Sequence, residues 1–226
     1  TASGYWVDTN RRTTINGLYA AGDVAGGCPQ KYVTGAMAEG EIAAEDIVKE
    51  LNRSDITENT FSQSTADEYA DKLTDERIKE YNEYLRREDK DTIFSTEELE
   101  EAMQKVMDTY AGGIGSHYQF NEKQLALAKD KIKQLIELSE DVAAEDMHEL
   151  MFVYELRERL TVCLVVIAHL EARKETRWHS FAENLDYTNK SDDYLKYVNS
   201  RYEDGRIKII YRDLVTGGKV YEHSDK

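Results

Sequence analysis

The segment 17–40 constrains the fold of this chain more than any other. Residues 18–21 form a short apolar run behind a turn signal, which predicts a buried strand. Asp23 lies just past the carboxyl end of this strand, where open α/β sheets bind ligands. A helix is expected over 39–51, and the small residues before it would direct its amino end back toward Asp23. The segment therefore predicts an acid beside a helix amino terminus.

These two features suit one half of a cofactor site. A carboxylate can accept a hydrogen bond from a ribose or ribityl hydroxyl group. The free N–H groups and the positive dipole end of a helix favour negative charge on a bound ring. The alternative is a strand and a turn that bind no ligand.

Charge and cysteine content exclude several classes of protein. The 226 residues include 29 Lys plus Arg and 45 Asp plus Glu, a net charge of -16 that repels phosphate backbones and argues against nucleic-acid binding. Cys28 and Cys163 lie far apart without metal-binding spacing, which indicates either a reducing compartment or indifference to redox state, and we expect a cytoplasmic protein. The longest apolar run, 160–170, is too short for a transmembrane segment. The chain begins at Thr1 in the middle of a pattern, which suggests a piece of a longer polypeptide.

Four regions follow one another along the chain. Residues 1–52 carry the segment described above. Residues 53–93 are a polar linker followed by a highly charged helix, expected over 65–89. Residues 94–176 predict a three-helix bundle, and residues 177–226 predict an extended tail with strand character.

Two helix starts in the bundle have clear capping signals. Ser95 with Glu98 three residues later forms a capping box, and Asn121 with Gln124 repeats the pattern. The helix after Asn121 is expected to bury one stripe at intervals of three and four residues, formed by Leu125, Ala128, Ile132 and Leu135.

A third bundle helix is expected from about 144 to 174. Its apolar residues cover nearly all faces between 160 and 170, so it should be central and buried. We expect Leu164, Val165 and Ile167 in its core. In the tail, residues 206–214 and 219–221 have strand character and could pair as a hairpin across a glycine-rich turn.

Several segments resemble a known family. Residues 13–23 resemble the second FAD-contacting segment of many flavoproteins. The order of segments resembles the succinate dehydrogenase/fumarate reductase flavoprotein superfamily and, within it, the α subunits of adenylylsulfate reductases. The stretches that carry this likeness are Gln104-Lys105-Val106-Met107-Asp108, Tyr110-Ala111-Gly112-Gly113, His148-Glu149-Leu150-Met151, Arg173-Lys174-Glu175-Thr176-Arg177-Trp178 and Val198-Asn199-Ser200-Arg201-Tyr202.

The resemblance implies an α+β chain: a remnant of an FAD-binding domain made of short strands plus a helix, then the three-helix bundle and a C-terminal β tail. It implies a flavin that exchanges electrons with a small substrate and receives them from an iron-sulfur, ferredoxin-like subunit. In the family, FAD is held mostly by an N-terminal FAD-binding half with a GxGxxG loop. The glycines at 112–115 lack the strand–turn–helix context of such a loop, so only the second half of the site is expected here.

The resemblance also assigns site residues. It implies that Asp23 binds the ribityl chain and that the backbone of 35–39 faces the pyrimidine edge of the flavin. The cofactor-binding residues expected on this basis are Gly22, Asp23, Gly35, Ala36, Met37, Ala38 and Glu39.

The substrate-facing residues are expected in the loop 28–35. Fumarate reductases have an HGxNRxG pattern there, and its absence argues against a C4-dicarboxylate substrate. Gln30 stands where adenylylsulfate reductases have a substrate-contacting histidine, and Lys31 matches a family lysine. Gln30 and Lys31 are therefore the candidate catalytic residues. Lys31 could pair with an anionic substrate or be a solvated loop lysine.

Other polar residues have simpler interpretations. His148 is expected to pack on a helix flank, and His169 is expected to be a neutral histidine within the core. A basic-aromatic cluster, formed by Arg173, Lys174, Arg177 and Trp178, is either a helix C-terminus that complements the dipole or a contact with the flavin domain, substrate or partner. We favour packing against the rest of the subunit.

Two functions remain open at this point. The chain is either the C-terminal portion of a flavin-dependent oxidoreductase subunit, of the adenylylsulfate reductase or the fumarate reductase type, or a stand-alone helical interaction domain without flavin or activity. The sequence upstream of Thr1 would distinguish them.

The first testable prediction concerns colour. As a separate 226-residue chain, the protein should be colourless and inactive, because the half of the site that holds the ADP moiety is not among these residues. An absorption spectrum of the purified chain tests this. A flavin band at near-stoichiometric intensity would contradict the prediction.

Overall fold

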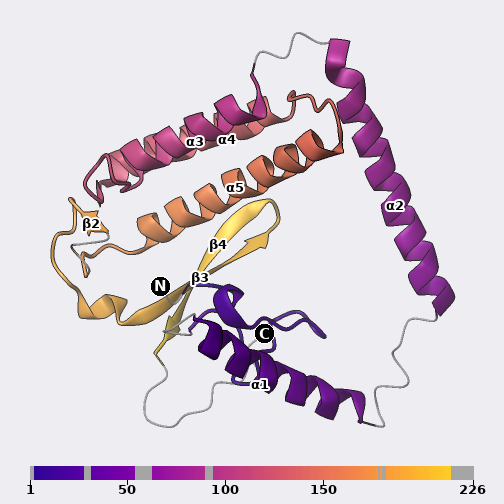
Figure 1. Ribbon diagram of the computed structural model, residues 1–226. Helices are drawn as coiled ribbons and strands as arrows, with labels where there is room; N and C mark the ends of the chain where they lie inside the picture. The colour runs from indigo at the N-terminus through magenta and orange to yellow at the C-terminus, as the bar shows by residue number, and fades with distance from the viewer. Residues whose placement is uncertain are drawn as a thin grey trace. The chain divides into compact units, whose positions relative to one another are not determined.

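The computed structural model describes residues 3–27, 32–53, 63–89, 94–177, 179 and 182–214. The chain divides into two compact units, Thr1–Asp67 with Val215–Lys226, and Glu68–Leu214. Figure 1 shows their elements, and each unit is described by itself.

The first unit contains a folded loop and one helix. Tyr5 pairs with Ala25 in a parallel bridge, and Arg12 pairs with Tyr19 in an antiparallel bridge. A short 3-10 helix, η1 (Gly22–Val24), follows and contacts helix α1 (Val33–Leu51).

The buried strand expected over 18–21 is not formed. Only the bridge at Tyr19 is present, Leu18 is 50% exposed, and Ala20 is the buried residue of the run. Among the described residues no second neighbour pairs with this segment, so it cannot be the inner strand of a sheet. Residues 13–15 form no strand either, and the Thr13 hydroxyl accepts the N–H of Ile15.

Helix α1 begins six residues earlier than the sequence predicts. Tyr32 is its N-cap in extended conformation, and the backbone is already helical from Val33. Gly35 is a weak helix former, but Ala36 and Ala38 are among the strongest, and α1 also contacts η1.

The second unit is mainly helical. Its elements are α2 (Gln63–Leu85, shared at its start with the first unit), η3 (Arg86–Asp89), α3 (Thr96–Tyr110), α4 (Glu122–Ser139) and α5 (Met147–Ala172). Helices α3, α4 and α5 lie alongside one another as a three-helix bundle (Figure 1). The charged helix expected over 65–89 corresponds to α2 and η3. No helix among the described residues is long and apolar enough to cross a membrane.

The helix caps largely follow the sequence. Ser95 and Glu98 form both bonds of the capping box at the start of α3. At the start of α4, the Asn121 side chain accepts the N–H of Gln124 at 2.8 Å. The reciprocal bond is missing, because the buried Oε1 of Gln124 has no hydrogen-bond partner among the described residues. This second capping box is therefore only half formed.

The core of the second unit lies between the three bundle helices. The expected stripe on α4 is buried as predicted. The remaining buried apolar residues of this cluster are Tyr84, Leu99, Met103, Phe120, Val142, Ala144, Leu150, Val153, Leu156, Leu160 and Ile167.

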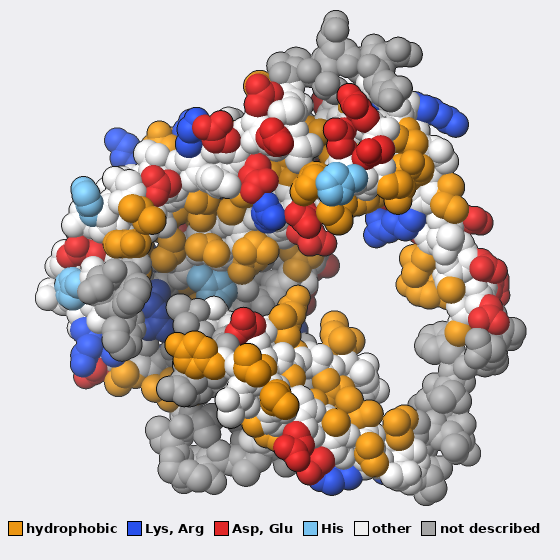
Figure 2. Space-filling view, in the orientation of Figure 1, with side chains coloured by type: hydrophobic (Ala, Val, Ile, Leu, Met, Phe, Trp, Pro, Cys, Tyr) orange, Lys and Arg blue, Asp and Glu red, His pale blue; other side chains and the backbone are white. Residues whose placement is uncertain are grey.

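Helix α5 is not buried all round. Ile167 is in the core, but Leu164 and Val165 are only half-buried. Val162 and Val166 are exposed, at 58% and 41%. One face of α5 packs on α3 and α4, and its C-terminal part also contacts two strands. The third face has no covering element among the described residues, so its apolar side chains stay at the surface (Figure 2).

The tail forms a hairpin, but not the expected one. Strand β3 (Lys196–Glu203) pairs antiparallel with β4 (Arg206–Asp213). Asp204 and Gly205 make the turn with φ angles of 50° and 74°, which is the left-handed pair that a type I′ hairpin turn requires. The predicted strand partner at 219–221 lies outside the described residues. A further pair of two-residue strands, β1 (Gln119–Phe120) and β2 (Glu183–Asn184), is parallel.

Burial of α5 can be tested by substitution. Leu156 is 1% exposed, so Leu156→Ala should lower the free energy of unfolding by about 2–5 kcal/mol. Val162 lies on the exposed face of the same helix and serves as the control, because Val162→Ala should change the free energy of unfolding by less than about 0.5 kcal/mol. Denaturant unfolding followed by helical circular dichroism gives both values. Equal losses would show that the two faces of α5 are misassigned.

Candidate functional site

One face of α1 carries acids instead of apolar residues. Glu39, Ala43, Asp46 and Glu50 recur at intervals of four, three and four, which places them on the same side of the helix. Glu39, Ala43 and Asp46 are buried. Buried acids are rare unless they are paired, so this face must be met by positive or hydrogen-bonding groups.

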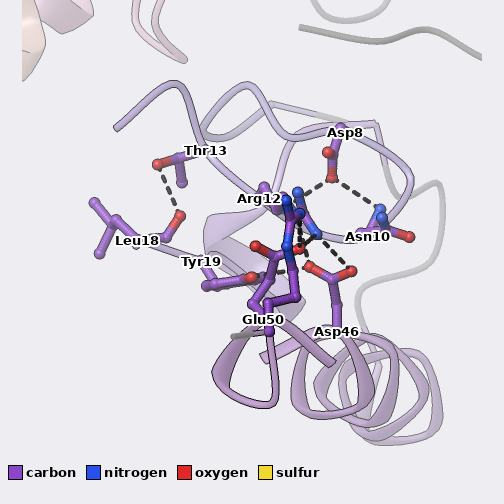
Figure 3. A network of polar contacts seen from close by, with 9 residues as sticks. Asp8, Asn10, Arg12, Thr13, Leu18, Tyr19, Asp46 and Glu50 are labelled. Carbon is purple, nitrogen blue, oxygen red and sulfur yellow. Dashed lines mark hydrogen bonds and ion pairs between the residues drawn. The ribbon is translucent and has the colours of Figure 1, made fainter. Parts of the chain in front are cut away.

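Arg12 binds the carboxyl-terminal half of this face. Its Nε and Nη2 atoms donate to the two oxygens of Asp46 at 2.5 and 2.8 Å, and Nη2 also donates to Glu50 at 2.7 Å. The Tyr19 hydroxyl donates to Asp46 Oδ2 at 2.8 Å. Figure 3 shows these side chains converging from the loop onto α1. The hydrogen bond from Arg12 holds the pKa of Asp46 below its ordinary value, against the opposing effect of burial.

Glu39 binds the loop near the amino-terminal half of α1. Its Oε2 accepts the N–H of Gly22 at 2.8 Å, and its Oε1 lies 3.4 Å from Nε of Arg11. Gly22 has a φ of 72°, and a Cβ added to it would lie 3.1 Å from Cβ of Ala36. Glycine is therefore required both by the left-handed backbone and by the close approach to α1.

Several predicted cofactor residues lie in this region. Asp23 is exposed on η1, directly after Gly22. The first turn of α1 contains no acidic residue, and Tyr32 supplies no side-chain cap. The N–H groups of the first residues of α1, up to Gly35, have no carbonyl within the helix to bind, and the first such bond is donated by Ala36 to Tyr32. The fold thus places Asp23 and the start of α1 in neighbouring elements, as predicted.

The other predicted residues differ in their surroundings. Met37 and Ala38 are exposed on α1, and Ala36 is half-buried beneath Gly22. Glu39 is buried, and its carboxylate is already bound to Gly22 and Arg11. The candidate catalytic residues Gln30 and Lys31 lie outside the described residues.

Sequence reasoning missed the residues that organise this region, namely Arg11, Arg12, Tyr19, Asp46 and Glu50. A signal was present: acids on α1 at helical spacing, and two consecutive arginines in the preceding loop. It was not decisive, because acids at such spacing usually mark a solvated helix face.

The arginines of the basic cluster at the end of α5 form ion pairs with a buried glutamate. The side chain of Glu175 is fully buried and accepts from Arg173 at 2.6 Å and from Arg177 at 2.8 and 2.9 Å. Arg173 also donates to the carbonyls of Tyr194 and Lys196. Burial would raise the pKa of Glu175, but the hydrogen bonds outweigh it and hold that pKa below its usual value. The partners of Arg173 and Arg177 are therefore other segments of the chain and not the last carbonyls of α5, so these arginines pack the chain and do not cap the helix dipole.

The remaining candidates have local partners. Lys174 pairs with Glu122 at 2.8 Å, and Trp178 lies outside the described residues. His148 is exposed and contacts Phe152 edge-on. His169 is half-buried, within 2.9 Å of the Ser200 hydroxyl, and burial lowers its pKa, as does the charge of Arg173. Among the described residues no group of three or more His, Cys, Asp and Glu could hold a metal ion.

The Arg12–Asp46 pair predicts a pH dependence. Because the pKa of Asp46 is lowered in the folded state, its contribution is present above the ordinary Asp pKa of about 3.9 and is lost as pH falls through the lower folded value. Asp46→Asn should therefore speed amide hydrogen exchange in α1 at pH 7, because it lowers the free energy of opening the helix by about 1–3 kcal/mol. The difference from wild type should shrink below about pH 4.

Glu45 provides the matched control for that experiment. It lies next to Asp46 in the same helix, but it is exposed and its ion pair with Lys49 is 3.8 Å long. Glu45→Gln should leave the exchange of α1 nearly unchanged at both pH values. If the two variants behave alike, the Arg12 contact does not stabilise α1.

Comparison with known proteins identifies the family of the chain. The sequence profile of the family described as "Fumarate reductase flavoprotein C-term" matches residues 100–222, more than half of the chain. The adenylylsulfate reductase subunit alpha of Megalodesulfovibrio gigas is 27% identical over 206 residues, which are 87% of this chain and 30% of that protein.

Solved structures extend the match to both units. Adenylylsulfate reductase from Archaeoglobus fulgidus has a TM-score of 0.74 and 31% identity, covering 95% of this chain and 34% of that one. The quinol fumarate reductase of E. coli has a TM-score of 0.73 at 22% identity, covering 97% and 37%, and this likeness shows the fold alone. The α+β fold class is thereby confirmed, and the chain spans about a third of the length of these relatives. The chain belongs to the fumarate reductase flavoprotein C-terminal family, within an oxidoreductase flavoprotein superfamily.

Proposed function

We propose that this chain is the C-terminal portion of an FAD-dependent oxidoreductase subunit that exchanges electrons between FAD and a small anionic substrate. The observation that carries the proposal is the 31% identity to an adenylylsulfate reductase, which extends over 95% of the chain. Identity to the fumarate reductase is 22% at nearly the same TM-score. Sequence likeness thus favours the adenylylsulfate reductase type where fold likeness does not discriminate.

The residues of the first unit fit the second half of an FAD site. FAD, when bound, supplies two-electron redox chemistry. Asp23, exposed on η1, would accept a hydrogen bond from a ribityl hydroxyl. Gly22 lets the η1 turn lie close against α1, where a Cβ would be 3.1 Å from Cβ of Ala36, and so keeps Asp23 near the start of that helix. The donors at the start of α1 are N–H groups without intrahelical partners, and the first turn of α1 contains no acidic residue, which suits an electronegative ring edge.

The start of α1 would also influence the flavin potential. A helix amino terminus stabilises adjacent negative charge by about 0.3–2 kcal/mol. In a two-electron couple, about 30 mV corresponds to 1.4 kcal/mol. This end of α1 would therefore raise the potential by tens of millivolts at most.

Partners follow from the same proposal. The relative in Megalodesulfovibrio gigas is named as a subunit alpha, which indicates an assembly with at least one other subunit. An iron-sulfur, ferredoxin-like subunit is the electron donor that the resemblance implies. The N-terminal FAD-binding half of the same subunit would complete the flavin site, in a cytoplasmic enzyme. The boundaries 1–52, 53–93, 94–176 and 177–226 stay predictions.

The substrate proposal rests on the sequence of the loop 28–35. Gln30 keeps a hydrogen-bond donor and an acceptor but carries no charge and supplies no proton, unlike the histidine expected there in adenylylsulfate reductases. Lys31 would pair with an anionic group of the substrate. We therefore propose another small anionic acceptor in place of adenylylsulfate itself.

The test is sulfite release from adenylylsulfate by the full-length enzyme with its partner, using a reduced dye as donor. Loss of a proton donor typically costs about 10²- to 10⁴-fold in rate, so wild type should be nearly inactive and Gln30→His should gain activity. Gln134→His, at an exposed position of α4, is the control for adding a histidine. Wild-type turnover of about 1 s⁻¹ or more, within the ordinary enzyme range, would overturn the substrate proposal and leave adenylylsulfate as the substrate.

A further inference from the structure

Two consecutive arginines divide the acid face of α1 between them. Arg12 binds Asp46 and Glu50, in the carboxyl-terminal half of the helix. Arg11 faces Glu39, seven residues and about two turns before Asp46. The two contacts therefore fix different ends of the same helix.

Arg11 has an unusual backbone for a residue with a long side chain. Its φ is 69°, in the left-handed region that is uncommon outside glycine. Asp8 holds this turn, because its carbonyl accepts both the N–H of Arg11 at 3.1 Å and the side-chain Nη1 of Arg11 at 3.2 Å. The Arg11 carbonyl in turn accepts the N–H of Ala20 at 3.0 Å. Strained conformations of this kind persist only where the surrounding contacts impose them, and they cluster at ligand sites.

Glu39 connects this strained turn to the loop that carries Asp23. One oxygen of its buried carboxylate accepts the N–H of Gly22, and the other faces Arg11. Gly22 is itself buried and lies against Ala36 in the first turns of α1. Asp23 follows in the chain, so the position of its carboxylate depends on the bond that Gly22 donates to Glu39. Arg12 instead binds Asp46 and Glu50, further along the helix.

We propose that Glu39 is a positioning residue for FAD, acting through its side chain and with Arg11 as its counter-ion. Its carboxylate does not meet the cofactor, because both oxygens are directed at protein groups. It holds the Gly22–Asp23 turn against the start of α1. The Asp23 carboxylate and the N–H groups at the start of α1 can then bind the same FAD molecule in a fixed geometry. The inference rests on the proposed FAD function. A site that is held in place before binding loses less freedom when the ligand arrives, which is the source of the expected effect on affinity.

The experiment uses the full-length subunit, with FAD removed and then titrated back. Glu39→Ala removes the acceptor of the Gly22 N–H and should weaken FAD binding roughly 10- to 100-fold, the range that loss of a supporting partner costs a bound group. Glu39→Gln keeps an oxygen for that N–H, so its dissociation constant should lie closer to wild type than that of Glu39→Ala. Exchange of the Gly22 amide in the FAD-free protein should be faster in Glu39→Ala.

Asp46→Asn is the matched control. It loosens the same helix through the other arginine, two turns away, and should change the FAD dissociation constant by less than about 3-fold. This comparison separates positioning from general stability. If both variants lose FAD in proportion to their loss of stability, the inference is overturned, because α1 then acts only as a scaffold.

The remaining outcomes distinguish the two proposals. If wild type binds FAD and Glu39→Ala binds it equally well, the inference about Glu39 is wrong and the proposed function stands. If wild-type full-length subunit binds no FAD, the proposed function fails, and the inference fails with it.

Discussion

Buried carboxylates need positive partners, and three of them fix the backbone of this chain. Glu39 faces Arg11, Asp46 binds Arg12, and Glu175 is enclosed by a pair of arginines at the end of α5. An unpaired charge in these positions would cost several kcal/mol, so each pair stabilises one local arrangement against its alternatives.

This constraint decides which polar residues remain for function. The arginines at the end of α5 bind Glu175 and backbone carbonyls. They cannot also bind an anion without losing these hydrogen bonds. In the first unit, by contrast, the ion pairs of Arg11 and Arg12 lie between the loop and α1. Asp23 and the start of α1 stay exposed. The pairing of buried carboxylates with arginines thus occupies the basic cluster at the end of α5, whereas it leaves the surface of η1 and the start of α1 accessible.

The comparisons and the local chemistry bear on different parts of the chain, because the family profile matches residues 100–222. The relatives are flavoprotein subunits about three times as long, and the chain matches them over both units. The helical bundle of the second unit has a continuous apolar core, and its polar clusters are bound within it. The features suited to a cofactor are thus found on η1 and α1 and not in the bundle.

The sequence alone determined the features that depend on neighbouring residues. The capping box at Ser95 and the buried stripe of α4 are set by bonds or periodicity within a few residues. The Asp204-Gly205 turn was equally local, and its hairpin was predictable from that pair, although the strand partner was sought downstream instead.

Only the tertiary structure decided the features that join distant segments. Arg12 and Asp46 are 34 residues apart, and no local pattern states which acid an arginine will meet. The exposed face of α5 was equally undetermined, because a helix that is apolar all round does not reveal which face lacks a neighbour. The strand expected at 18–21 failed for a related reason, since a strand needs a partner on each side to be buried and the described chain supplies one bridge. Pairing and covering are properties of two segments at once, whereas sequence patterns describe one segment at a time.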